Sequence, residues 1–312
     1  MSFENLVTQL TTHWEFDYEP KVKALRDLYE VAKKEQWNVS SDINWKLEID
    51  KEGDILARPQ DPMRELDLVK ALPDAKRQQL AISSAAWTLS QFLHGEQGAL
   101  LCCGQLVESV PDIDGKLYAA TQVVDEARHV EVFHRYLKRQ HKVYPIDPSL
   151  KAVLNQILEA DMWQMKCLGM QVIVEGLAMG AFKIMKEESN DELLRNVVEL
   201  TAQDEARHVS YGVMQLKWYL DHHSDRAGAV EELHRFADVG EQVILSAFTE
   251  AALVEPVAVL LGGGIDKIDQ GMQGFTKLWT MFMEEYLQRC ERAGFDRRGR
   301  VKLPTVAPWG GR

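Results

Sequence analysis

The hexapeptide Asp-Glu-Ala-Arg-His-Val occurs twice in this chain, at residues 125–130 and again, unchanged, at 204–209. Each copy contains a Glu-x-x-His motif, which Glu126 and His129 form in the first copy. Because an α-helix turns once every 3.6 residues, a Glu and a His three positions apart leave the helix on the same face. Each copy can therefore present one carboxylate and one imidazole to the same metal centre.

The second motif, Glu205 and His208, follows the first by 79 residues. The same offset joins Glu96 to Glu175, and each of these stands 30 residues before the Glu of its own Glu-x-x-His. A repeat of this length exceeds the range of about 20–50 residues that is typical of solenoids, and it indicates a duplicated helical hairpin. One Glu from each of two helices plus one Glu-x-x-His from each of two others is the ligand set of di-iron and di-manganese helix bundles.

The alternative to a metal site is a set of ordinary charged residues on solvated helix faces, which a lone Glu-x-x-His would not exclude. Here all six side chains interrupt apolar stripes, so they are expected to be buried. A buried, unpaired carboxylate costs several kcal/mol, whereas two divalent cations balance four carboxylates. We therefore predict a dinuclear metal site formed by Glu96, Glu126, His129, Glu175, Glu205 and His208.

Composition limits the class of protein. The 312 residues are 46% apolar and 27% charged, as in a globular chain, and the net charge of −12 argues against a nucleic-acid partner. No apolar run approaches the roughly 18 residues of a membrane span, and the N-terminus lacks signal-peptide features. Cys102, Cys103, Cys167 and Cys290 fit no disulfide framework. The sequence predicts a soluble, cytoplasmic protein with no membrane partner.

Helical periodicity predicts an all-α fold, since almost no segment alternates with period two. The first three bundle helices are expected at about 74–110, 114–141 and 161–187, and a connecting segment is expected at about 148–160. The fourth bundle helix is expected to begin at a cap formed by Ser189 or Asn190 and to end at about residue 222. Three flanking helices are expected at 20–36, 225–254 and 265–293.

We interpret residues 1–312 as a single domain. Its core bundle spans about 72–222, with flanking helical regions at about 20–71 and 225–293. The C-terminal tail, 297–312, is basic and rich in Pro and Gly, so it is expected to be a loose surface strap or a dimer arm.

The pattern Glu96…Asp125-Glu126-x-Arg128-His129…Glu175…Asp204-Glu205-x-Arg207-His208 resembles the ferritin-like di-iron carboxylate oxidoreductases. The motif is most similar to the hydroxylase subunits of bacterial multicomponent monooxygenases. The ribonucleotide reductase small subunit, the acyl carrier protein desaturases and the arylamine N-oxygenases are more distant relatives. The resemblance covers about residues 80–222 and implies a ferritin-like four-helix bundle with additional N- and C-terminal helices.

The resemblance also implies a cofactor of two iron ions, with Mn/Fe or Mn/Mn as possible alternatives, and O2 as co-substrate. It divides the ligands into terminal and bridging residues: Glu96 and His129 on one iron, Glu175 and His208 on the other, and Glu126 and Glu205 between them, with Glu205 bridging or shifting with redox state.

Residues next to the ligands are candidates for an outer shell. A ligand histidine needs its outer N–H held, which a carboxylate usually does. Asp125 and Asp204 are the candidates, and in the resembled family each reaches the histidine of the opposite hairpin. Arg128 and Arg207 would then offset the aspartate charges. The alternative for all four is an ordinary ion pair on the helix surface.

Departures from the family narrow the chemistry. Phe133 replaces the radical tyrosine of the reductase small subunit, and Ala178 and Met179 stand where hydroxylases and desaturases carry a threonine. Thr201, one turn before Glu205, can offer a hydroxyl instead, although a helical Thr more often bonds its own backbone. The N-oxygenases place an extra histidine ligand at the position of Thr201, so two histidine ligands are expected here.

Five apolar or weakly polar residues stand one or two turns from the ligands. They are core residues by default, and they become pocket walls if the site contains a cavity: Phe92, Cys103, Phe133, Met179 and Phe182.

Two functions from different classes follow. The first is an O2-activating dinuclear iron oxidase or monooxygenase that acts on a small, largely apolar organic substrate, in a protein expected to be a homodimer. Its electrons would come from an external reductase or ferredoxin, because the chain has no flavin, nucleotide or iron–sulfur motif. The alternative is a dimetal protein without an organic substrate, either an iron-storage ferroxidase or a manganese catalase. Ferritin subunits, however, lack long flanking helices.

Overall fold

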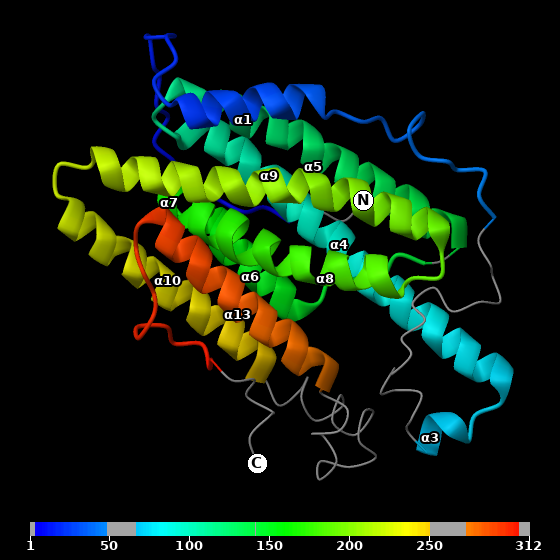
Figure 1. The fold of residues 1–312 in the computed structure, drawn as a ribbon. Coiled ribbons are helices and arrows are strands. Elements are labelled where there is room, and N and C mark those ends of the chain that lie inside the picture. Colours follow the sequence, from blue (N-terminus) through cyan, green and yellow to red (C-terminus); the bar gives the residue numbers. More distant parts are fainter. Residues whose placement is uncertain (1–3, 49–66, 141, 250–272, 306–312) are drawn as a thin grey trace.

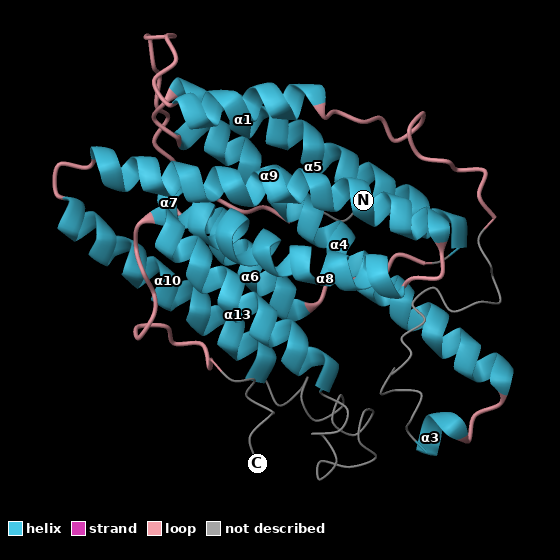
Figure 2. Cartoon of the chain, viewed as in Figure 1, coloured by secondary structure: helices cyan, strands magenta, loops and turns pink. Residues whose placement is uncertain are grey.

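The computed structural model describes residues 4–48, 67–140, 142–249 and 273–305 (Figure 1). Every regular element in these ranges is a helix (Figure 2), so the all-α prediction is confirmed. The central bundle consists of three long helices and a composite rod: α4 (Asp74–Ser109), α5 (Ile113–Gln140), α9 (Glu192–His222), and the rod of α7 (Trp163–Cys167), the π-helix η1 (Leu168–Val174) and α8 (Glu175–Glu188).

Shorter helices cover the bundle from several sides. Helix α1 (Lys23–Lys34) lies along α5 and α9, while α10 (Arg226–Thr249) and α13 (Gln273–Ala293) pack against η1 and α9 (Figure 1). Helix α6 (Pro148–Glu159) packs against α4, and α3 (Asp67–Lys70) is a single turn. The predicted flanking helices are therefore present. The expected ends at 250–254 and 265–272 lie outside the described residues.

The buried apolar residues form two clusters that face each other along the bundle. Each bundle element contributes residues to one cluster along one part of its length and to the other cluster along the rest. A short interval separates the two parts. The residues that bound this interval are Leu93 and Ala99 on α4, Ala119 and Val132 on α5, Ile173 and Phe182 on the rod, and Val198 and Tyr211 on α9. A polar layer thus crosses the middle of the bundle, and all six predicted ligands stand within it.

The segment 148–160, expected to be a connection, is instead helix α6. Asp147 caps it by accepting the backbone N–H groups of Ser149 and Leu150, and Pro148 occupies the first turn, where its missing N–H costs nothing. The expectation of a connecting segment was wrong, because a proline is tolerated in the first turn of a helix and Asp147 supplies the cap.

The predicted cap of the fourth helix is also wrong. Asp191, not Ser189 or Asn190, caps α9, and its carboxylate accepts the backbone N–H groups of Leu193 at 2.8 Å and Leu194 at 3.2 Å. The Ser189 hydroxyl instead accepts a hydrogen bond from the backbone N–H of Asp191. Ser189 therefore fixes the capping residue instead of capping the helix itself.

The third bundle element is not the single α-helix that we predict at 161–187. In η1 the backbone bonds span five residues, so that the N–H of Glu175 bonds to the carbonyl of Met170. A π-turn inserts one extra residue into the helix and is often found at functional sites. Here it ends directly before the predicted ligand Glu175.

The sequence was expected to contain no apolar run long enough to span a membrane, and the rod is an exception. The segment Trp163–Glu187 is long and apolar enough to cross a membrane by length and composition, although half of its most apolar window is buried inside the protein. The rod faces α9 on one side and α10 and α13 on another. A helix covered on several sides is apolar around most of its circumference. Its hydropathy therefore has an explanation within the bundle.

The tail is not loose where the structure describes it. Arg297 is fully buried and forms ion pairs with Asp238 at 2.6 Å and with Glu241 at 2.9 Å, both on α10. The indole N–H of Trp279 donates to the carbonyl of Pro304. Because a buried guanidinium needs acceptors, these contacts fix residues 297–305 against α10 and α13. Residues 306–312 lie outside the described residues.

A glycine sets how closely α9 approaches η1. A Cβ added at Gly212 would lie 2.5 Å from Cβ of Gln171, whereas a Cβ at Gly104 meets nothing within 4 Å. We therefore expect Gly212→Ala to destabilise the fold by about 1–3 kcal/mol through overpacking. The control Gly104→Ala should stabilise it by about 0.5–1 kcal/mol, because alanine favours helices. Urea unfolding measures both changes, and equal stability of the two variants would contradict the close contact.

Candidate metal centre

The six predicted ligands converge in the polar layer as two groups, each able to hold a metal ion. Within each group one ligand atom from every residue lies within 4.8 Å of all the others. The first group is Glu96, Glu126, His129 and Glu205, and the second is Glu126, Glu175, Glu205 and His208. Glu126 and Glu205 belong to both groups, which is the arrangement required of residues that bridge two ions.

The two imidazoles point their Nδ1 atoms into the centre. Nδ1 of His129 lies 3.1 Å from Glu205, 3.2 Å from Glu96 and 3.4 Å from Glu126. Nδ1 of His208 lies 3.1 Å from Glu126 and 3.3 Å from Glu205. One nitrogen cannot bond three carboxylates well at once, whereas a cation between them can bind all of these atoms.

The hydrogen bonding of the carboxylates fits metal ions. Both oxygens of Glu126 and Oε2 of Glu175 are buried without a hydrogen-bond partner among the described residues. Buried polar atoms are nearly always paired, and an unpaired carboxylate oxygen is especially costly. Imidazole nitrogens and carboxylate oxygens are ligands that iron and manganese accept. The donor set therefore fits two such ions.

The pKa shifts of the ligand residues fit a site that binds cations. Burial, together with neighbouring carboxylates, raises the pKa of Glu96 and Glu175 well above the ordinary range. Burial acts to lower the pKa of His129 and His208, but the surrounding carboxylates raise it well above the usual value. The contacts of Glu126 with the two histidines lower its pKa against the effect of burial, so the added protons belong to Glu96, Glu175 and the imidazoles, where bound cations would replace them.

Asp125 and Asp204 make the crossed contacts that we expected. Oδ2 of Asp204 lies 3.1 Å from Nε2 of His129, and Oδ2 of Asp125 lies 3.1 Å from Nε2 of His208. Each aspartate belongs to the helix that does not carry its histidine, so the two contacts join α5 to α9. They also leave Nδ1 of each ring to face the centre, which is how an outer carboxylate orients a metal-bound histidine.

The arginines of the repeated hexapeptide are buried and do not form ordinary surface ion pairs. Nη2 of Arg128 bonds to Asp125 at 2.6 Å and to Asp204 at 2.9 Å. Arg207 bonds to Asp204 and lies 3.7 Å from Asp125. Against the effect of burial, the histidine contacts lower the pKa of both aspartates. The aspartates are therefore held as anions facing the imidazoles.

Three residues around the centre were missed by the sequence argument. The Trp37 indole N–H donates to Asp204 at 2.7 Å, and Gln36 donates to Asp125 at 2.9 Å. Both follow α1, far from the motifs in sequence, and no pattern marks them. Gln122 donates to Glu175 at 3.1 Å. Its position one turn before Glu126 on the same helix face is a signal that could have identified it.

The predicted pocket residues fall on both sides of the centre. Phe92, Phe133 and Phe182 pack together, with ring centroids 4.8–6.3 Å apart, inside one apolar cluster. Cys103 belongs to the other side, where the Gln171 amide lies 3.9 Å from its sulfur. Met179 is half-buried. Their role as walls of a substrate cavity stays a prediction.

The Thr201 hydroxyl is fully buried and has no hydrogen-bond partner within the described part of the chain. The expected bond to its own backbone is therefore not made. The hydroxyl stands one turn before Glu205 on α9, and its role toward a molecule bound at the centre stays a prediction.

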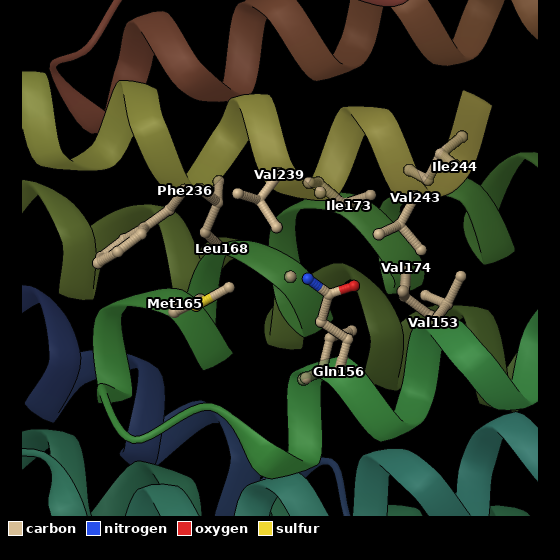
Figure 3. Close-up of a pocket in the computed structure, with 13 residues that line it drawn as sticks. Val153, Gln156, Met165, Leu168, Ile173, Val174, Phe236, Val239, Val243 and Ile244 are labelled. Atoms are coloured by element: carbon tan, nitrogen blue, oxygen red, sulfur yellow. The ribbon is translucent and has the colours of Figure 1, made fainter. Parts of the chain in front are cut away.

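An apolar groove lies outside the rod, between α6, η1 and α10 (Figure 3). Leu168, Ile173 and Val174 form its η1 wall, and Gln156 is the one polar side chain among its lining residues. Its free volume is about 30 Å³, room for only a few water molecules. None of the six ligands lines it, although Val174 directly precedes Glu175.

Comparisons with known proteins place this geometry in context. Residues 19–250 match the family model described as P-aminobenzoate N-oxygenase AurF. Among solved structures, a variant R2-like ligand-binding oxidase with an aerobically reconstituted Mn/Fe cofactor is 17% identical, with a TM-score of 0.57, over 89% of this chain and 94% of its own. A second variant, with an anaerobically reconstituted Mn/Fe cofactor, is 19% identical, with the same TM-score and coverage. These similarities show the same fold. No curated protein sequence matches the chain.

Proposed function

Since the chain belongs to the AurF family, described as P-aminobenzoate N-oxygenase, we propose that this dinuclear metal oxidoreductase uses O2 to oxidise a small, largely apolar organic molecule. The family match includes all six candidate ligands and lies within the superfamily that the motif indicated. The sequence motif had placed the N-oxygenases among the more distant relatives, behind the hydroxylase subunits of the multicomponent monooxygenases.

The observation that carries the proposal is the pair of ligand groups that share Glu126 and Glu205. When bound there, two iron ions would supply electrons to O2 and act as Lewis acids. Manganese in one position is the alternative, because carboxylates and imidazoles suit both metals. Asp125 and Asp204 hold the histidine rings in place. The apolar clusters on both sides of the polar layer keep bulk water from the reacting atoms.

The family description favours an aromatic amine as the first substrate to test. Phe92, Phe133 and Phe182 offer a ring-lined surface on one side of the centre, and the Thr201 hydroxyl offers a hydrogen bond. Thr201 also stands where the resembled N-oxygenases carry an extra histidine, so the reaction on an amine needs a direct test. We further propose a soluble, cytoplasmic homodimer that receives electrons from an external reductase or ferredoxin.

The test supplies the reduced, Fe(II)-loaded protein with isotopically labelled O2 and three compound classes: arylamines, apolar hydrocarbons and acyl chains. Oxygen insertion consumes one O2, two electrons and two protons, and it releases one water. We expect one class to gain labelled oxygen, or to be dehydrogenated, in proportion to O2 uptake. Metal-free protein serves as the control.

A parallel measurement addresses the alternative function. Excess Fe(II) is supplied without any organic compound, and a separate manganese-loaded sample is given hydrogen peroxide. Mineralisation of many irons per chain would indicate a ferroxidase, and rapid peroxide disproportionation would indicate a catalase. Either result, without turnover of an organic compound, contradicts the proposal.

A further inference from the structure

A group of buried polar atoms without protein partners lies on the side of the metal centre away from the phenylalanine rings. The group consists of two tyrosine and three glutamine side chains, all fully buried. In this group, the atoms without a hydrogen-bond partner among the described residues are the hydroxyls of Tyr118 and Tyr211 and the Oε1 atoms of Gln122, Gln171 and Gln215. Buried polar atoms are nearly always satisfied by protein or by ordered water.

These side chains stand at successive turns of α5 and α9 inside the bundle, with Gln171 on η1. Tyr118 and Gln122 stand two turns and one turn before Glu126 on α5, while Tyr211 and Gln215 stand one and two turns after His208 on α9. The two tyrosine rings stack across the bundle with centroids 4.8 Å apart. We name these residues, with one glutamine from η1 and one aspartate from the α4–α5 turn, the polar column: Asp112, Tyr118, Gln122, Gln171, Tyr211 and Gln215.

Both ends of the column are defined by hydrogen bonds. At the centre, the Gln122 amide donates to Glu175 at 3.1 Å. At the outer end, the Gln215 amide donates to Asp112 at 2.6 Å. Because each amide uses its NH2 group on a carboxylate, its carbonyl is left facing the column as an acceptor. The column therefore runs from the candidate metal ligand Glu175 to the carboxylate of Asp112, in the turn that precedes α5.

The outer end lies close to the protein surface. Asp112 stands in the turn between α4 and α5, and it also accepts the N–H of Gly115 at 2.7 Å. Ile113, Lys116 and Val107 line a surface cavity of about 270 Å³ at this turn. The charged groups that act on Asp112 from this turn are Asp114 and Lys116. The surface cavity is thus lined by Ile113, the residue that directly follows Asp112 in the chain.

A purely structural role does not explain the free hydroxyls. Buried tyrosines elsewhere in the described chain have carboxylate partners, since Tyr136 bonds to Asp191 at 2.7 Å and Tyr286 bonds to Glu241 at 2.6 Å. A buried polar group left unpaired costs about 1–3 kcal/mol. A phenylalanine would fill the same space, as Phe133 does on the other side of the centre. The hydroxyls of Tyr118 and Tyr211 are therefore expected to bond small molecules, and water suits a polar, enclosed site with several partners.

We propose that the polar column carries ordered water and delivers protons from Asp112 to the metal centre. The hydroxyls and waters pass the protons, and the glutamine amides hold the waters in place. Reduction of one O2 by two Fe(II) takes up two protons and gives two Fe(III) and one hydrogen peroxide. Oxygen insertion, on which the proposed function rests, also consumes two protons. These protons come from solvent. A second polar chain, from Gln36 and Arg128 through Asp125 and Asp204, ends on the outer nitrogens of the two ligand histidines, whereas the column ends on the carboxylate of Glu175.

The first test does not depend on activity. A high-resolution crystal structure of the metal-free protein should show ordered waters bonded to the hydroxyls of Tyr118 and Tyr211, and Tyr211→Phe should lose at least one of them. A wild-type column without ordered water would overturn the proposal. Tyr286→Phe, which removes a hydroxyl on α13 that bonds to Glu241 and is not part of the column, should keep every column water.

The second test follows oxidation of the Fe(II)-loaded protein by O2 without any organic compound. With metal content unchanged, Tyr211→Phe and Gln215→Leu should each slow oxidation by about tenfold or more and enlarge the solvent deuterium isotope effect. Tyr286→Phe should stay within about twofold of the wild type. Wild-type rates and isotope effects in both column variants would overturn the proposal. Because no organic compound is present, failure to find a substrate contradicts the proposed function and leaves this result intact.

Discussion

Replacing Glu126 with alanine should lower the metal content from about two ions per chain to well below one. Glu126 is shared by both ligand groups, and its two oxygens lie 3.1 Å and 3.4 Å from the Nδ1 atoms of His208 and His129. Its removal therefore takes one ligand from each ion. Loss of residues outside the ligand shell typically weakens metal binding about 10–100-fold, so loss of a bridging ligand should exceed that range.

The measurement is metal analysis of reconstituted protein, together with O2 uptake. Glu96 belongs to one group alone, so Glu96→Ala should leave about one ion per chain. Glu131→Ala changes an exposed glutamate on the same helix and should leave both ions in place. A Glu126→Ala protein that still binds two ions would show that the residue is not a bridge.

Metal binding should raise the melting temperature strongly. Without cations, the four buried carboxylates repel one another, and burial together with this repulsion raises the pKa of Glu96 and Glu175 well above the ordinary range. Ions that bind the folded chain alone stabilise it by about 4 kcal/mol per site at a concentration of a thousand times Kd. For a protein of this size such a gain raises Tm by roughly 10 °C per site.

Calorimetry of the chelated and the Fe(II)- or Mn(II)-loaded protein measures this increase. The Glu126→Ala variant is the matched control, because it should show little rise in Tm when the same metal is added. Equal melting temperatures of chelated and loaded wild-type protein would mean that the centre does not bind metal in the folded state.

The sequence alone determined three of the four bundle elements as single α-helices, placed the fourth, and identified the six candidate ligands of the centre. The spacing of the repeated hexapeptide was sufficient, because the 3.6-residue turn fixes which side chains share a helix face whatever surrounds the helix. The offset of 79 residues then identified Glu96 and Glu175, which have no local motif of their own. The crossed contacts of Asp125 and Asp204 followed from the resemblance and are present in the structure.

Tertiary structure alone decided which distant residues complete the centre. Trp37 and Gln36 reach the aspartates of the hexapeptides only because α1 packs on α5 and α9, and no local periodicity records that packing. The π-turn before Glu175 and the column that ends at Asp112 likewise could not be predicted from the sequence. They depend on how closely neighbouring helices approach and on which buried atoms find partners there. Those quantities are set by the whole chain, whereas helix faces are set by each segment's own geometry.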